Sequence, residues 1–237
     1  MILGAHQPNY LPWIGYFLKI ARADHFVLAD NTQYTRQSYI NRTRIKIGNR
    51  AHWLSVPVLS SALGPQEIHQ VGIDNSKNWA RKHWQTIRNQ YHNTPGFARF
   101  GPGLEEIYGC QWNRLVDLNC ALLEYFCRCF EIFTPLTLGT ALKIDAADAT
   151  DRIVQMVLAT GCNTYLSGTG GSLNYLCPHQ VEAAGIGLRF LEVKHPLYPQ
   201  SGRGFIAGLS ALDFLFNTGM DAPAFFAAFA YPESVAR

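Results

Sequence analysis

The sequence predicts an α/β protein with a Rossmann-like, mostly parallel sheet flanked by helices, a β-hairpin and a helical insertion. Residues 1–5 are an apolar run of strand length, and residues 14–22 follow with the period of an amphipathic helix. Residues 24–30 contain a second apolar run, which completes a β-α-β unit whose two strands point the same way. The same strand pattern returns around Leu166 and Leu188. These observations favour a parallel sheet with helical crossovers.

The chain next alternates in the manner of a hairpin. Ile45 and Ile47 alternate with polar residues, and residues 48–50 supply a glycine-containing turn before a second run over 51–58. Pro57 indicates that this second strand lies at an edge or is ending, because proline cannot donate to a strand ladder.

Two helices are expected after the hairpin. One runs from Ser76 to about Tyr91 and the other from about Gln111 to Phe130, and Gly101-Pro102-Gly103 is expected to break the chain between them. The α/β pattern resumes near Thr137. Residues 74–132 therefore read as an insertion, and residues 1–237 as a single domain.

The remaining third completes the α/β pattern. Its expected elements are a helix capped by Asp148 or Thr150 and ending at Gly161, strands over 163–166 and 187–192, and a helix from the N-cap Ser210 to Gly219.

Composition excludes several functional classes. The 237 residues are 48% apolar, which is ample for a folded core, and 20 Lys+Arg against 17 Asp+Glu leave a net charge of +3, too mild to argue for nucleic-acid binding. No apolar run approaches the ~20 residues of a membrane span, and the first residues lack the pattern of a secretory signal. We expect a cytoplasmic protein without membrane contact. The six cysteines lack C-x-x-C spacing, so no metal site is indicated.

The first strand leads into a loop that is built like a binding site. Ligands in open α/β sheets bind beyond the carboxyl ends of the strands, and His6 stands at that edge. Two prolines, Pro8 and Pro12, stiffen the loop. The alternative is a well-packed turn with a core histidine. The polar and aromatic candidates for substrate binding here are Gln7, Asn9, Tyr10 and Trp13.

Two more strand ends are expected at the same edge. Asp30 follows the second strand and opens an irregular polar stretch whose candidate ligand-binding residues are Gln33, Tyr34, Asn41 and Arg42. The alternative is a mobile surface loop. The later strand runs into Ser167-Gly168-Thr169-Gly170-Gly171, whose free N–H groups could bind phosphate or carboxylate, although a glycine-rich turn is equally often only a turn.

Several of these stretches together resemble the WbqC-like protein family, in the right order over nearly the whole chain. They are His6 to Trp13, Asp30-Asn31-x-Gln33-Tyr34 with Ile40-Asn41-Arg42, Trp53 to Val58, Tyr165 to Gly168 with Tyr175-Leu176, and Tyr198-Pro199-Gln200 before Leu209 to Asp213. The resemblance adds Tyr175, Tyr198 and Gln200 to the candidate substrate-binding residues, and it also includes Ser167 and Gly168 of the glycine-rich turn. Family members are encoded among surface-polysaccharide and natural-product genes, which implies a tailoring step in biosynthesis.

The leading hypothesis is a transferase that moves an acyl or aminoacyl group to an amine or hydroxyl of a sugar or natural-product intermediate. His6 would act as general base, Asp30 would orient it or the acceptor, and Arg42 with residues 167–171 would hold an anionic or activated donor. No cofactor or oligomeric state is indicated.

Three alternatives remain at this point. One is a non-catalytic binding or scaffold protein of a biosynthetic complex. A second is a nucleotidyltransferase-like enzyme, although residues 12–16 lack the histidines of an H-x-G-H motif. A third is use of charged tRNA or a carrier-bound substrate, for which Lys77, Arg81, Lys82 and Arg88 could supply a basic surface.

Overall fold

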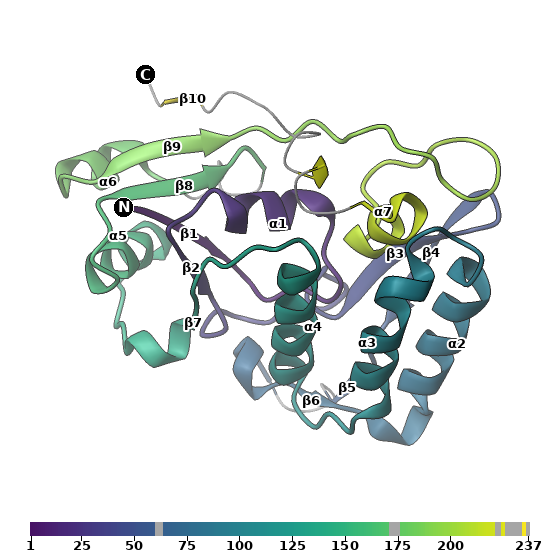
Figure 1. The fold of residues 1–237 in the computed structure, drawn as a ribbon. Helices are drawn as coiled ribbons and strands as arrows, with labels where there is room; N and C mark the ends of the chain where they lie inside the picture. Colours follow the sequence, from purple (N-terminus) through teal and green to yellow (C-terminus); the bar gives the residue numbers. More distant parts are fainter. Residues whose placement is uncertain (60–63, 171–175, 221–223, 226–233, 236–237) are drawn as a thin grey trace.

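A Rossmann-type strand order organises the molecule. The computed structural model describes residues 1–59, 64–170, 176–220, 224–225 and 234–235. Its main sheet has the order β10-β9-β8-β1-β2-β7, in which β9, β8, β1, β2 and β7 are parallel and β10 is antiparallel to β9 (Figure 1). The strands are β1 (Ile2–His6), β2 (His25–Leu28), β7 (Leu136–Leu138), β8 (Thr164–Gly168), β9 (Gly187–Leu191) and β10 (Ser234–Val235).

This order places the topological switch between β1 and β8. The chain moves from β1 outward to β2 and β7, and then returns to the other side of β1 for β8 and β9. Loops that leave β1 and β8 therefore diverge, and a crevice opens beyond their carboxyl ends. The expected α/β fold with a mostly parallel sheet is confirmed.

Side chains from alternate positions of the strands build a core on each face of the sheet. On one face Phe26 and Leu28 pack with helices α1 (Ile14–Ala21) and α4 (Leu115–Cys129). On the other face Leu3, Val27 and Leu188 pack with α5 (Ala149–Ala159) and α6 (Pro178–Ala183). Both faces are buried, as a parallel sheet requires.

The expected hairpin and helical insertion both lie between β2 and β7. The hairpin pairs β3 (Arg42–Ile47) with β4 (Arg50–Ser55), and β5 (Val58–Leu59) pairs with β6 (Gly72–Ile73). The other elements here are the 3₁₀ turns η1 (Ile68–Gln70) and η2 (Asn75–Lys77), and helices α2 (Trp79–Tyr91), α3 (Phe97–Gly109) and α4. Figure 1 shows α2, α3 and α4 side by side, with α2 at the end of the molecule away from α5.

One expectation in this region is wrong. Residues 101–103 were expected to break the chain, yet Gly101, Pro102 and Gly103 lie inside α3. Gly103 is needed there because a Cβ atom at its position would lie 2.5 Å from the Tyr125 ring of α4. Close packing of α3 on α4 therefore overrides the local signal for a break.

Two further elements complete the fold. They are the 3₁₀ turn η3 (Gly139–Leu142) after β7 and helix α7 (Ala211–Thr218) after β9. Ser210 caps α7 by accepting a hydrogen bond from the Leu212 N–H, and Gly219 ends it at a φ of 60°. Within the described residues, no helix is both long enough and apolar enough to span a membrane.

Candidate functional site

A cavity of about 1150 Å³ opens at the carboxyl ends of β1, β2 and β8. Its walls come from the loops after these strands, from α1 and α5, and from a segment over residues 65–70. This is the crevice that the strand order predicts at the switch point. One part of the wall is apolar, with Ile153, Met156, Leu191 and Val193, and another part carries amide, hydroxyl and charged side chains.

His6 ends β1 and lines this cavity. Its Nδ1 lies 3.0 Å from the Gln7 carbonyl oxygen, and because a carbonyl can only accept, Nδ1 carries the proton and Nε2 keeps its lone pair. Solvent reaches the ring through the cavity, although protein surrounds it, including the Tyr16 ring at 4.8 Å. Desolvation and the Lys19 charge lower the pKa of His6 to about 4. The imidazole is therefore neutral at pH 7 and can accept a proton at Nε2.

Two cations line the cavity, and sequence reasoning missed both. Lys19 lies on α1, is 7% exposed, and donates from Nζ to the Ala5 carbonyl at 2.7 Å. Arg152 lies on α5 and donates from Nη1 to the Asn31 carbonyl at 2.7 Å. The sequence pattern that could have identified Lys19 is a single lysine in a helix whose other residues are apolar or aromatic.

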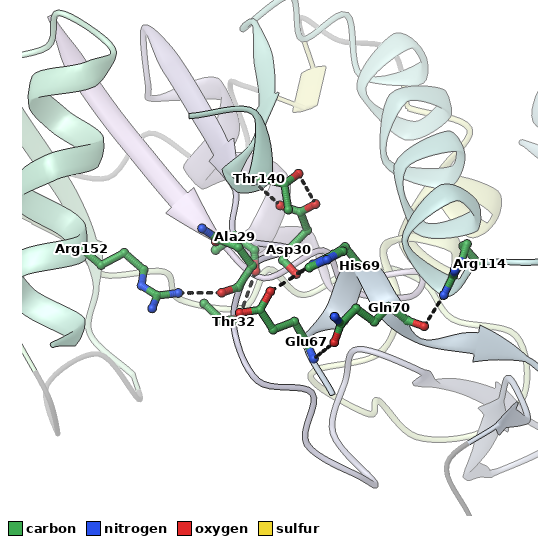
Figure 2. Close-up of polar contacts among 10 residues, drawn as sticks. Ala29, Asp30, Thr32, Glu67, His69, Gln70, Arg114, Thr140 and Arg152 are labelled. Atoms are coloured by element: carbon green, nitrogen blue, oxygen red, sulfur yellow. Dashed lines mark hydrogen bonds and ion pairs between the residues drawn. The ribbon is translucent and has the colours of Figure 1, made fainter. Parts of the chain in front are cut away.

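The segment over residues 65–70 forms the opposite wall. It docks on the loop after β2 through backbone hydrogen bonds from Tyr34 N to Gln66 O at 2.8 Å and from Ile68 N to Thr32 O at 3.0 Å. Glu67 lines the cavity, and its carboxylate lies 3.3 Å from His69 Nδ1 (Figure 2). These contacts fix a polar wall across from α5.

Trp13 supplies an aromatic surface at the cavity wall. Its ring is 37% exposed and stacks on His195 with 6.1 Å between ring centroids. Gly15 permits this position, because a Cβ atom there would lie 2.3 Å from the Trp13 ring. Trp13, the N-cap residue of α1, is thus held with its ring at the wall of the cavity that His6 also lines.

The structure brings only some of the expected site residues together. His6, Gln7, Trp13, Gln33 and Gly168 line the cavity. The amide of Gln7 donates to the Thr32 hydroxyl at 3.0 Å, which joins the loops after β1 and β2.

Asp30 lies at the expected edge of the sheet, but its carboxylate is hydrogen-bonded to Thr140 and does not contact His6. Its two carboxylate oxygens accept from the Thr140 N–H and the Thr140 hydroxyl, each at 2.8 Å (Figure 2). It is 1% exposed and does not line the cavity. In this structure Asp30 ties the end of β2 to η3, and His6 hydrogen-bonds to Gln7 instead.

The other residues expected from the first loop lie in the core. Tyr10 is fully buried, and its hydroxyl bonds with His83 Nδ1 at 2.8 Å and with the Tyr108 hydroxyl. Asn9 and Tyr34 are 8% and 9% exposed, and neither lines the cavity. These side chains shape the loops that carry His6 and Gln33.

Asn41, Arg42 and Ser167 also lie outside the cavity lining. The Asn41 amide donates to the Val56 carbonyl at 3.0 Å, and the Arg42 guanidinium lies 4.1 Å from the Trp53 ring centroid. The buried Ser167 hydroxyl donates to the Gly168 carbonyl at 3.2 Å. Arg42 therefore does not face His6 across this cavity. The positively charged side chains among the described lining residues are Lys19 and Arg152.

Tyr198 and Gln200 brace the C-terminal region. The Tyr198 hydroxyl donates to Asp213 Oδ2 at 2.8 Å, and the Tyr91 hydroxyl donates to Asp213 Oδ1 at 2.6 Å. The Gln200 amide exchanges two hydrogen bonds with the Ile206 backbone. Tyr175 and Gly171 fall outside the described residues.

The titratable side chains do not form a metal centre in the part of the chain that the structure describes. No group of three His, Cys, Asp or Glu side chains that could hold a metal ion occurs among residues 1–59, 64–170, 176–220, 224–225 and 234–235.

Comparison with known proteins shows the family to which the chain belongs. The model of the WbqC-like protein family matches residues 7–225. The chain belongs to the WbqC-like family. It is 32% identical over 220 residues to the uncharacterized protein Rv1507c of Mycobacterium tuberculosis, a match that covers 92% of this chain and 94% of that protein. No solved structure matches the chain. The residues that match the family model begin at Gln7, directly after His6. They include Trp13, Lys19 and the whole of α5.

Proposed function

We propose that this WbqC-like protein is a tailoring transferase that moves an acyl or aminoacyl group from an anionic or activated donor to an amine or hydroxyl of a sugar or natural-product intermediate. The observation that carries the proposal is the position of His6 on the wall of the switch-point cavity, with Nδ1 hydrogen-bonded to the Gln7 carbonyl and Nε2 left to accept a proton. At about 1150 Å³ this cavity is larger than the roughly 300–1,000 Å³ of most single-ligand sites, which gives room for a donor and an acceptor.

The chemical step assigns His6 one role. The acceptor nitrogen or oxygen attacks the acyl carbon of the donor, a bond forms between them, and the bond from the acyl carbon to the leaving group breaks. The proton lost by the acceptor passes to His6 Nε2 and then to the leaving group or to water. The lowered pKa keeps the His6 imidazole neutral at pH 7, and it also makes His6 a weaker base than a free histidine.

The experiment is a turnover assay with a matched histidine control. Purified protein is incubated with acyl-CoA thioesters, aminoacyl-tRNA or carrier-bound acyl donors and with amino sugars as acceptors, and products are detected by mass spectrometry. His6→Ala should lower turnover by roughly 10²–10⁴-fold. His52→Ala removes an exposed histidine of β4 outside the cavity and should keep the wild-type rate. Equal rates for wild type and His6→Ala would refute the assignment.

One observation favours a second candidate, a binding protein without turnover. Both Asp30 oxygens accept hydrogen bonds from Thr140, and within the described residues His6 has no carboxylate partner. A binding protein would hold its ligand in the same cavity, and His6→Ala would change the dissociation constant while no product formed with any donor.

A further inference from the structure

Two lysines are buried among the residues that the structure describes, and their surroundings differ. Lys46 on β3 is fully buried and Lys19 on α1 is 7% exposed. Each donates to one backbone carbonyl, Lys46 to Gly204 and Lys19 to Ala5. Burying an ammonium group is costly unless a negative charge or several acceptors replace its water.

Lys46 has an anionic neighbour within the protein. Its charge acts on the buried carboxylate of Asp213, which also accepts hydrogen bonds from Tyr91 and Tyr198. Burial raises the pKa of Asp213, and the two tyrosines and Lys46 oppose that rise. Lys46 therefore belongs to a satisfied internal network.

Lys19 has no such neighbour. No carboxylate pairs with it among the described residues, and burial alone lowers its pKa, to about 8. Its Nζ contacts both strands of the switch point, through the Ala5 carbonyl on β1 and the Tyr165 ring on β8, whose centroid lies 5.5 Å away. Lys19 also lines the cavity, as do Gly168, Thr169 and Gly170.

We propose that Lys19 is the anion anchor of the cavity and that the ligand presents a phosphate or carboxylate group to its Nζ in the crevice between β1 and β8. The anionic group of the ligand would supply the negatively charged partner that Lys19 lacks among the described residues. Arg152 on α5 lines the same cavity and adds a second positive charge. This inference rests on the proposed function for the identity of the donor, but anion binding itself does not require turnover.

The affinity of the cavity for an anion should depend on pH, because anion binding is linked to the protonation of Lys19. The charged and titratable groups that line the cavity with Lys19 are His6 on β1, Tyr16 on α1, Tyr165 on β8, Arg152 on α5, its N-cap residue Asp148, and Glu67 on the opposite wall. An empty cavity leaves Lys19 partly neutral near pH 8, whereas a bound oxyanion favours the ammonium form. Affinity should therefore fall as pH rises above about 8.

The test compares lysine variants with simple anions. Thermal unfolding is followed for wild type, Lys19→Met and Lys46→Met with increasing sulfate or acetate, whose charges do not change between neutral and alkaline pH. Lys143→Met, at an exposed lysine outside the cavity lining, is the surface control. Sulfate stands for phosphate and acetate for carboxylate, so the two arms separate the sources of the anion.

The expected result has two parts. At least one anion binds the wild type and both controls, and Lys19→Met weakens that binding by about tenfold or more, as expected for a lost charged hydrogen bond. Without anion, Lys19→Met should raise the unfolding temperature, because it removes an unpaired buried charge, and Lys46→Met should lower it. Sulfate also stabilises proteins non-specifically, but that effect is common to all four proteins.

Two results would overturn the inference. One is an unchanged anion affinity in Lys19→Met, and the other is a loss of stability in Lys19→Met as large as in Lys46→Met. The results that would refute the transferase proposal differ from those that would refute the anion anchor. Anion binding that depends on Lys19 without turnover of any donor leaves the anchor intact, whereas turnover with an unchanged KM in Lys19→Met refutes the anchor and leaves the transferase.

Discussion

At the scale of single residues, Asp30 shows how a strand-end carboxylate can serve the framework. Both of its oxygens are satisfied by one residue, Thr140, which lies 110 positions along the chain. The two hydrogen bonds link β2 to the turn after β7, next to the loop that carries Thr32 and Gln33 into the cavity. Asp30 therefore acts on the site by holding the backbone beneath it.

Replacing this carboxylate should cost stability. Asp30→Asn leaves one acceptor oxygen and places an NH₂ group opposite a donor, so the free energy of unfolding should fall by about 1.5–3 kcal/mol, the range for hydrogen bonds to a charged group. Urea unfolding of Asp30→Asn, Thr140→Val and the double variant measures the coupling. Additive losses in the double variant would show that the two residues do not act together.

The same residues show what sequence can predict about a site. Residue type and strand-end position were sufficient to select His6, Gln7, Trp13, Gln33 and Gly168, which all line the cavity. Position alone did not separate them from Asp30, Tyr10 or Tyr198, because their partners Thr140, Tyr108 and Asp213 are brought near only by the fold. The cavity-lining Lys19 was missed because one charged residue in a short helix usually faces solvent.

At the scale of elements, α3 shows tertiary packing overriding local preference. Pro102 removes a backbone donor from the helix interior, which costs about 3 kcal/mol in an isolated helix. The helix nevertheless forms, because Phe100, Leu104 and Tyr108 are buried against its neighbours. The Tyr125 hydroxyl donates to the Phe100 carbonyl and holds the ring against Gly103.

Two glycines of this helix give opposite predictions. Gly103→Ala should destabilise the protein by about 1–2 kcal/mol, since a clash with the Tyr125 ring outweighs the roughly 1 kcal/mol that alanine gains in helix propensity. Gly109→Ala is the matched control, because its Cβ atom would meet nothing within 4 Å. Chemical denaturation of both variants checks the pair, and a stabilised Gly103→Ala protein would contradict the packing described for α3 and α4.

At the scale of the whole molecule, strand order places the site. Hydrophobic periodicity was enough to predict the parallel strands, their crossovers and the hairpin, because each is encoded within a short stretch of chain. It did not give the return of β8 to the side of β1, which is a long-range choice, yet that pairing creates the switch point. The cavity also depends on residues 65–70, whose docking on the loop after β2 involves backbone atoms that carry no side-chain signal.

The most direct test of this account is a thermal-shift screen of the wild type, His6→Ala and His52→Ala against nucleotides, nucleotide sugars, acyl-CoA thioesters, amino acids and charged tRNA. A ligand that binds the switch-point cavity stabilises the native state by mass action. The account predicts one donor class that shifts the unfolding temperature of wild type and His52→Ala and shifts His6→Ala much less. An equal shift in His6→Ala would place the ligand elsewhere and contradict the account.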